Sequence, residues 1–237
     1  MGGEGRPLRA LVTGAARPGG IGAAVAARLL DAGIEVRTLD VEPGCTFQVD
    51  LVDGELPQLG DVDVLVSNAG LPTIVGSAHS MPRERWQRDL DVNLTGSFRV
   101  LQACLGGMRE RRFGRIVVVS SFAARFGMPA QVAYSASKAG LLGMVKTVAA
   151  ENAALGITAN AILPGLVDTD GVRAMPPEIV EAWLARVPSG RLVAPSEIAE
   201  AVWFLASPGA GSVTGQELVI DGGLTLNSLS VTRSVLR

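Results

Sequence analysis

Tyr134 and Lys138 stand four residues apart in the segment Tyr-Ser-Ala-Ser-Lys, and Ser121 precedes the tyrosine by thirteen residues. Residues four apart in a helix share one face, so we expect the phenol and the ammonium to lie side by side. Free tyrosine has a pKa of ~10, and a neighbouring positive charge favours the phenolate. The spacing therefore predicts that Lys138 lowers the pKa of Tyr134 for general acid/base catalysis, while the Ser121 hydroxyl holds a substrate oxygen.

The composition limits the kind of protein. Of the 237 residues, 48% are hydrophobic, which is enough for a sizeable core. The net charge of −2 indicates neither a nucleic acid nor an anionic membrane as partner. Cys45 and Cys104 are too few for a disulfide framework and lie in no metal-ligand spacing. With no signal peptide and no apolar run near the ~20 residues of a membrane helix, we expect a soluble, cytoplasmic protein without a metal site.

Short apolar runs alternate with helical patterns along the whole chain. Strands are expected at about 8–13, 35–39, 46–49, 62–67, 116–119, 158–163 and 217–220. Helices are expected at about 21–32 (closed by Gly33), 83–111, from Tyr134 to Leu155, and 196–206 with Ser196 as N-cap. Apolar strands joined by helical crossovers imply a parallel sheet covered on both faces. We expect a single doubly wound Rossmann-type α/β domain over residues 1–237, with about seven parallel strands, and only a loop between Asp40 and Thr46.

A glycine-rich turn between the first strand and the first helix is typical of a dinucleotide site. Thr13-Gly14 and Gly20-Ile21-Gly22 let the backbone approach a pyrophosphate, and the helix N-terminus adds amides and a partial positive charge. Asp40, at the end of the second strand, would accept hydrogen bonds from ribose hydroxyls and repel a 2′-phosphate. This favours NAD(H). NADP(H) stays possible, because Arg17 or Arg37 is able to pair with a phosphate.

These residues resemble the short-chain dehydrogenase/reductase family, from Thr13 to about Leu224. The matching motifs are Thr13-Gly14…Gly20-Ile21-Gly22, Asp50-Leu51, Ser67-Asn68-Ala69-Gly70, Asn93, Ser121, Tyr134…Lys138, Pro164-Gly165-Leu166-Val167-Asp168-Thr169, Arg191…Pro195…Glu197-Ile198-Ala199 and Asp221-Gly222-Gly223. The resemblance implies a catalytic tetrad of Asn93, Ser121, Tyr134 and Lys138, in which Asn93 anchors a water that links Lys138 to solvent.

The resemblance also implies a set of cofactor contacts. Besides Tyr134 and Lys138, the expected residues are Gly14, Arg17, Gly20, Ile21, Gly22 and Asp40 around the turn, Asp50 and Leu51 at the adenine, Asn68, Ala69 and Gly70 beneath the cofactor, and Pro164, Gly165, Val167 and Thr169 near the nicotinamide. Hydride would then move between the nicotinamide and a substrate carbon.

In this family the segment after Thr169 shapes the substrate site, and here that segment is mostly apolar. It contains Ala174, Met175, Pro176, Pro177, Ile179, Trp183 and Leu184, and Leu71, Phe122 and Phe126 are candidate walls. We expect an NAD(P)-dependent oxidoreductase for a small apolar or cyclic secondary alcohol or ketone, with Arg125 or Arg173 available for a negatively charged group. These apolar residues equally fit simple packing on the domain. His79 lies outside every motif and is expected to be solvated.

Two other functions stay open. A 3-oxoacyl-[acyl-carrier-protein]-type ketoreductase would use the basic cluster Arg109, Arg111, Arg112 and Arg115 to attract an acidic carrier protein, although such a run is also typical of a solvated helix end. A non-catalytic dinucleotide-sensing protein has no need of Tyr134 and Lys138 together. The resemblance further suggests a homotetramer, or a homodimer, packed through the long helices before and after the fifth strand. Residues 226–237 form a C-terminal extension beyond the matched region.

Overall fold

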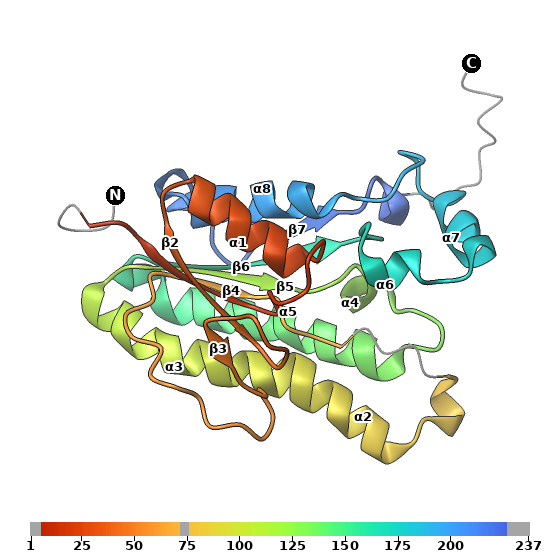
Figure 1. Cartoon of the computed structure of the whole chain (residues 1–237), viewed down its shortest axis with the longest axis horizontal. Coiled ribbons are helices and arrows are strands. Elements are labelled where there is room, and N and C mark those ends of the chain that lie inside the picture. Colours follow the sequence, from red (N-terminus) through yellow and green to blue (C-terminus); the bar gives the residue numbers. More distant parts are fainter. Residues whose placement is uncertain (1–5, 72–75, 227–237) are drawn as a thin grey trace.

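Seven parallel strands form one sheet, as the sequence predicts, and their order is β3-β2-β1-β4-β5-β6-β7 (Figure 1). The structure, a computed structural model, describes residues 6–71 and 76–226. The strands are β1 Arg9–Thr13, β2 Glu35–Asp40, β3 Phe47–Gln48, β4 Val64–Ser67, β5 Gly114–Val119, β6 Ile157–Pro164 and β7 Glu217–Ile220. Because all of them run in one direction, their carboxyl ends meet at a single edge of the sheet.

Helices cover both faces of the sheet (Figure 1). α1 (Ile21–Asp31) and α8 (Pro195–Ala206) pack on one face, and α3 (Gly96–Arg111) and α5 (Val132–Asn152) pack on the other. In β1, Ala10 and Val12 face α1 and α8, whereas Leu11 faces α3 and α5. This alternation explains why the central strands are apolar at nearly every position: both faces of each strand are buried.

The remaining elements lie mainly in the connections. α2 (Arg83–Leu90) runs through a π-helical turn, Asp91–Thr95, into α3. The short helices are α4 (Ala123–Phe126), α6 (Asp170–Arg173) and α7 (Pro177–Leu184), and single 3₁₀ turns occupy Ala78–Ser80, Ala153–Leu155, Pro208–Ala210 and Leu224–Leu226. The connection from β2 to β3 is a loop, as expected. Beyond Leu226, the C-terminal extension lies outside the described residues.

One predicted helix start is wrong. Ser196 is not the N-cap of α8, because the helix begins at Pro195 and Ala194 is the capping residue. Glu197 supplies the missing acceptor: its carboxylate accepts the Ala194 N–H at 2.8 Å and pairs with Arg191 at 2.7 Å. Proline at the first helical position explains the shift, since its fixed φ suits that position and it has no N–H to satisfy.

The end of α1 follows the prediction more closely. Ala32 is the C-cap, and Gly33 follows it with φ +78°. The amides of Gly33 and Ile34 then donate to the last carbonyls of the helix. None of the helices in the described part of the chain is long and apolar enough to cross a membrane.

Candidate active site

The predicted catalytic side chains meet at the carboxyl edge of the sheet. Ser121 follows β5, and Tyr134 and Lys138 lie in the first turns of α5. Tyr134 is hydrogen-bonded to Ser121. The Lys138 Nζ lies 5.7 Å from the centre of the Tyr134 ring and donates to the Val119 carbonyl at 3.0 Å. Two elements far apart in sequence thus bring the serine, tyrosine and lysine together.

The pKa of Tyr134 differs from the prediction. Burial raises the pKa of the phenol, and the hydrogen bond with Ser121 lowers it by less. Burial also lowers the pKa of Lys138 to about 8. Both shifts have one cause, since removal from water disfavours the charged form of either group. The expectation that Lys138 lowers the tyrosine pKa is therefore wrong for this structure, in which Nζ points to the Val119 carbonyl.

Two serines that the sequence did not single out as functional hold the catalytic helix in place. Ser120 is buried, and its hydroxyl donates to the Lys138 carbonyl at 2.9 Å, which ties α5 to the end of β5. Ser137 donates to the Tyr134 carbonyl at 2.8 Å and accepts from the Asn93 side chain at 3.1 Å. The repeated serines of the segment from Tyr134 to Lys138 were the available signal, but their partners come from other elements.

Asn93 lies within the π-helical turn and is fully buried. Its Oδ1 accepts the Leu71 N–H at 2.7 Å, and its Nδ2 donates to the Leu71 carbonyl at 3.3 Å as well as to Ser137. A Cβ on Gly70 would lie 3.0 Å from the Asn93 Oδ1 and 3.2 Å from the Lys138 Nζ. Gly70 therefore leaves room for the side chains of the tetrad, and Asn93 joins the segment after β4 to α5.

The glycine-rich turn forms a tight backbone cradle. Gly14 has φ +69°, and a Cβ there would lie 2.7 Å from the Ala69 Cα. A Cβ on Gly22 would lie 2.1 Å from the Gly14 carbonyl oxygen. The Asn68 amide donates to the Gly14 carbonyl at 2.9 Å, and the Thr13 hydroxyl accepts the Ala69 N–H at 3.0 Å.

A side chain at either glycine would collide with main-chain atoms of the neighbouring segments, so this close packing of the turn requires glycine at both positions. Gly20 is the N-cap residue and Ile21 the first residue of α1, and no side chain caps this helix start. The uncapped N-terminus of a helix suits an anion such as a pyrophosphate. The residues present therefore fit a dinucleotide.

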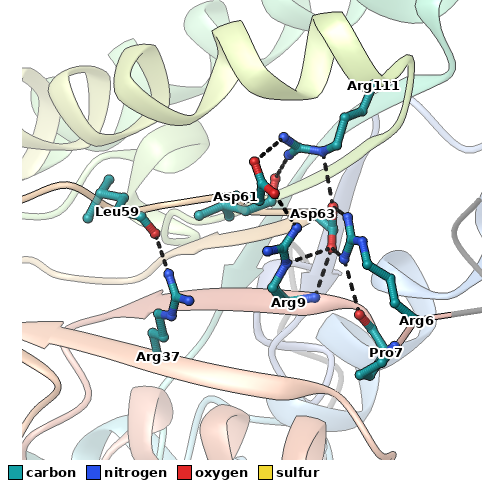
Figure 2. Close-up of polar contacts among 9 residues, drawn as sticks. Arg6, Pro7, Arg9, Arg37, Leu59, Asp61, Asp63 and Arg111 are labelled. Atoms are coloured by element: carbon teal, nitrogen blue, oxygen red, sulfur yellow. Dashed lines mark hydrogen bonds and ion pairs between the residues drawn. The ribbon is translucent and has the colours of Figure 1, made fainter.

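At the adenosine end, Asp40 organises the loops around it. Its Oδ2 accepts the Ala16 N–H at 2.9 Å and its Oδ1 accepts the Glu42 N–H at 3.1 Å. Arg17 pairs with Glu42 at 2.8 Å. Arg37, by contrast, donates to the Leu59 carbonyl at 2.6 Å (Figure 2). Arg37 is therefore held by the loop before β4, and the suggestion that it binds a cofactor phosphate is wrong for this structure.

The other predicted cofactor residues follow β3 and β6. The Asp50 Oδ1 accepts the Val52 N–H at 2.8 Å, and the Leu51 side chain is buried in the core. Gly165, after Pro164, packs so closely on Asp221 that a Cβ would lie 2.8 Å from its Cα. Val167 is buried and paired with Val193, and Thr169 is the N-cap residue of α6.

The predicted substrate lid meets the site through two aromatic rings. Trp183 of α7 packs edge-to-face on Phe122, with ring centres 6.1 Å apart and an interplanar angle of 84°. Phe122 directly follows Ser121, so the lid reaches the catalytic residues. The arginines that were candidates for an anionic group are both paired, Arg125 with Glu217 and Arg173 with Asp168.

Only part of the basic cluster is available as surface charge. Arg111 binds Asp61 and the Val62 carbonyl (Figure 2). Arg115 is 5% exposed and donates to the Gly156 carbonyl at 3.1 Å. Arg109 donates to Asn152, and the exposed Arg112 donates to the Ala154 carbonyl at 3.0 Å. These contacts lie around the start of β5, at the opposite end of that strand from Ser121. Arg111 is neutralised by Asp61 and Arg115 is buried, whereas Arg109 and Arg112 are exposed and keep their charge.

Two other features add nothing to this centre. His79 is exposed and shares a hydrogen bond with Ser77 in the turn before α2, as expected for a solvated residue. Within residues 6–71 and 76–226 there is no group of three or more His, Cys, Asp or Glu side chains that could hold a metal ion. The chemistry available at this site is therefore that of the serine, tyrosine and lysine beside a dinucleotide cradle.

A doubly wound parallel sheet with this cradle and this catalytic group defines a dinucleotide-dependent oxidoreductase. A protein-family model described as enoyl-(acyl carrier protein) reductase matches residues 48–225. Acetoacetyl-CoA reductase of Rhizobium meliloti is 42% identical over 90% of this chain and 97% of its own length. The 3-oxoacyl-[acyl-carrier-protein] reductase FabG of Vibrio cholerae is 39% identical over 91% of this chain and 96% of its own.

A solved structure supports the same conclusion. An oxidoreductase of the short-chain dehydrogenase/reductase family from Burkholderia thailandensis superposes with a TM-score of 0.81 at 33% identity, over 94% of each chain. The chain belongs to the short-chain dehydrogenase/reductase family. It is an NAD(P)-dependent oxidoreductase that acts on a secondary alcohol or ketone.

Proposed function

We propose that this protein reduces a 3-oxoacyl thioester to the 3-hydroxyacyl thioester. The observation that carries the proposal is the Tyr134 phenol, which is hydrogen-bonded to Ser121 and whose pKa burial raises. A phenol with a raised pKa keeps its proton near neutral pH, so it is suited to donate that proton to a carbonyl oxygen. The phenol is therefore the proposed proton donor in the reduction of a ketone.

Each catalytic residue has a proposed role. Ser121 donates a hydrogen bond to the substrate carbonyl oxygen, which orients it towards the phenol. Tyr134 gives its proton to that oxygen as negative charge develops on it. Lys138 and Asn93 hold the tyrosine helix and the floor of the site at Gly70. When bound, the nicotinamide cofactor supplies the hydride that the substrate carbon accepts.

The thioester is favoured by the relatives and by the charge distribution. The two relatives described above, each over 90% or more of this chain, have names that specify acetoacetyl-CoA and a 3-oxoacyl carrier-protein thioester as substrates. Arg111 is paired with Asp61 and Arg115 is buried, so only two of the four arginines of the predicted cluster, Arg109 and Arg112, stay exposed to attract an acidic carrier protein. We therefore propose a coenzyme A thioester ahead of a carrier-protein thioester.

We further propose that NAD(H) is the preferred cofactor. The Asp40 carboxylate lies at the end of β2 and is oriented by the amides of Ala16 and Glu42. A carboxylate in this place accepts hydrogen bonds from the adenosine ribose and repels a 2′-phosphate. For the compartment we propose the cytoplasm, because Cys45 and Cys104 are both free.

A free apolar or cyclic ketone, or the corresponding alcohol, is the second candidate substrate. It is favoured by the apolar wall that Phe122 and Trp183 form beside Ser121. Such a wall suits a hydrocarbon ring as well as the acyl part of a thioester, and it offers no charged group to a coenzyme A phosphate.

The test measures nicotinamide absorbance with acetoacetyl-CoA, the same acyl group on a carrier protein, and a cyclic ketone, each with NADH and with NADPH. We expect the fastest turnover with acetoacetyl-CoA and NADH. Turnover of the cyclic ketone alone would replace the thioester with the second candidate. Tight NADH binding without turnover of any substrate would instead support a dinucleotide-sensing protein.

A further inference from the structure

A second acidic residue lies beside the predicted adenosine site. Glu42 follows β2 by two residues, and its Oε1 lies 2.8 Å from an Nη atom of Arg17. Arg17 belongs to the glycine-rich turn, twenty-five residues earlier. The ion pair therefore joins the turn at the end of β1 to the loop at the end of β2. Neither the family motifs nor the names of the relatives assign a role to Glu42.

The two carboxylates on this loop act on one guanidinium. Asp40 accepts the Glu42 N–H at 3.1 Å and the Ala16 N–H at 2.9 Å. Its position is therefore fixed by the amide of the residue before Arg17 and by the amide of the ion-pair partner of Arg17. The pKa of Arg17 is raised, first by its hydrogen bond with Glu42 and also by the charge of Asp40. Arg17 is thus a cation beside Asp40 that could bind a 2′-phosphate. Its guanidinium is already paired with Glu42.

This arrangement is open to competition. The Arg17 side chain is 76% exposed and that of Glu42 is 47% exposed, so water and ions weaken the attraction between them. A phosphate offers a guanidinium a stronger, bidentate partner than one carboxylate oxygen does. The pair is therefore strong enough to bias the position of Arg17 and weak enough to be broken by an incoming phosphate.

We propose that Glu42 sets the cofactor preference indirectly, by competing with the 2′-phosphate of NADP(H) for the Arg17 guanidinium. Asp40 acts on the ribose, and Glu42 acts on the arginine that would otherwise compensate for Asp40. This inference rests on the NAD(H) preference proposed above and names the residue that enforces it.

The test is equilibrium binding of NADH and NADPH, followed by the fluorescence of the reduced nicotinamide, so it requires no substrate. Glu42→Gln removes one charge and keeps the backbone N–H that binds Asp40. We expect it to tighten NADPH about fivefold, the size typical of exposed charges, and to change NADH by less than about twofold. Glu35→Gln, at the opposite end of β2, makes the same change in net charge and should alter neither cofactor.

Arg17→Gln distinguishes an effect of Glu42 through Arg17 from direct repulsion of the phosphate by Glu42. In an Arg17→Gln background, the Glu42→Gln substitution should no longer tighten NADPH, because there is no arginine to release. An equal gain in both backgrounds would overturn the proposal, since it would mean that Glu42 repels the phosphate directly. Absence of any gain would overturn it as well. If the wild-type protein bound neither dinucleotide, the proposed function itself would fall, and this result is distinct from the other two.

Discussion

Tyr134 and Lys138 owe their chemistry to burial. Removal from water raises the pKa of the phenol and lowers that of the amine to about 8, so both groups shift towards their neutral forms. The tyrosine is left as a proton donor, hydrogen-bonded to Ser121. The lysine is left with a proton that it loses far more easily than an exposed lysine does. Two predictions follow from these residues.

Tyr134→Phe removes the proton donor and little else. We expect turnover to fall by about a thousandfold, as general acid catalysis by a positioned side chain contributes rate factors of this order. Binding of NADH should stay within about twofold of wild type, because the ring and its packing are kept. Stopped-flow reduction of acetoacetyl-CoA and fluorescence titration measure the two quantities. A mutant with wild-type turnover would remove Tyr134 from the mechanism.

Lys138→Met should stabilise the fold. Lys138 is 4% exposed, and its folded-state pKa of about 8 lies below the ~10.4 of an unfolded lysine. Below pH 8 both states carry the proton, and the native state bears the full penalty of a buried charge. As the pH rises from 8 towards ~10.4, the native state alone loses the proton, so the wild-type free energy of unfolding rises.

We expect the methionine variant to gain about 2 kcal/mol in the free energy of unfolding at pH 7, and to lose this advantage above pH ~10.4. Urea denaturation at several pH values measures it. Equal stability of the two proteins at pH 7 would show that the hydrogen bond to the Val119 carbonyl offsets the burial of the charge.

Among the elements, α7 meets the predicted substrate side of the site through the contact of Trp183 with Phe122. Trp183→Ala removes the edge-to-face packing on Phe122, which typically contributes about 1 kcal/mol, and frees the lid. We expect KM for the ketone to rise about tenfold with a smaller change in kcat, because the catalytic residues lie on β5 and α5. Glu181→Gln, at an exposed position of the same helix, is the control. A change in kcat alone would place Trp183 in the chemical step instead of in substrate binding.

The amino ends of β1, β4 and β5 are joined by a buried carboxylate. Asp63, with a side chain 2% exposed, accepts two hydrogen bonds from Arg6, at 2.7 and 3.0 Å, and one from the Arg9 N–H at 3.0 Å (Figure 2). Arg111 lies 3.4 Å away. Burial by itself would raise the pKa of Asp63, but the hydrogen bonds of Arg6 and Arg9 and the arginine charges outweigh it and lower the pKa.

Asp63→Asn leaves Arg6, Arg9 and Arg111 without their shared charge partner. Because these arginines are 21–38% exposed and reach water, the substitution should cost about 1–2 kcal/mol in the free energy of unfolding. Because the folded pKa lies below the unfolded ~3.9, Asp63 stabilises the protein above that pH and the contribution is lost as pH falls through the folded pKa. The variant should therefore lose part of the acid dependence of stability. Asp61→Asn, where the side chain is 52% exposed, should cost much less. Equal losses in the two variants would contradict the role of burial.

At the scale of the whole molecule, exposed apolar side chains lie on the helices that are expected to form a subunit interface. Phe98 on α3 is 46% exposed, and Ala150, Ala153 and Ala154 are exposed on α5 and the turn after it. These residues lie on the two long helices that the family resemblance assigns to a tetramer interface. Large apolar groups left in water on such helices favour association.

Phe98→Glu places a charge on this surface, and we expect it to shift the proposed homotetramer to smaller species in sedimentation velocity. Leu30→Glu is the matched control: Leu30 is 56% exposed on α1, over the other face of the sheet, and should leave the assembly intact. Dissociation by Leu30→Glu alone would move the interface to the α1 face. A wild-type monomer would refute the proposed assembly.

The sequence by itself determined the architecture and pointed to the side chains that the structure brings together at the predicted catalytic centre. Apolar strands, helix patterns and the loop after Asp40 are local signals, because backbone preference and burial on two faces act within a few residues. The glycine-rich turn was also predictable from the sequence. A backbone that must approach a ligand or another chain segment leaves no room for side chains, so glycine marks such a place. The positions of Ser121, Tyr134 and Lys138 followed from the motifs that carry them.

Only the tertiary structure decided how charged side chains are used. Arg37 turns to the Leu59 carbonyl, Arg115 is buried, and Arg17 pairs with Glu42, although each could have faced a ligand. The direction of the Tyr134 pKa shift depends on burial by α5 and its neighbours, which no four-residue spacing reveals. Long, flexible, charged side chains reach partners from distant elements, and the free energy of each charge depends on the water that folding removes. These two properties exist only once the elements have packed.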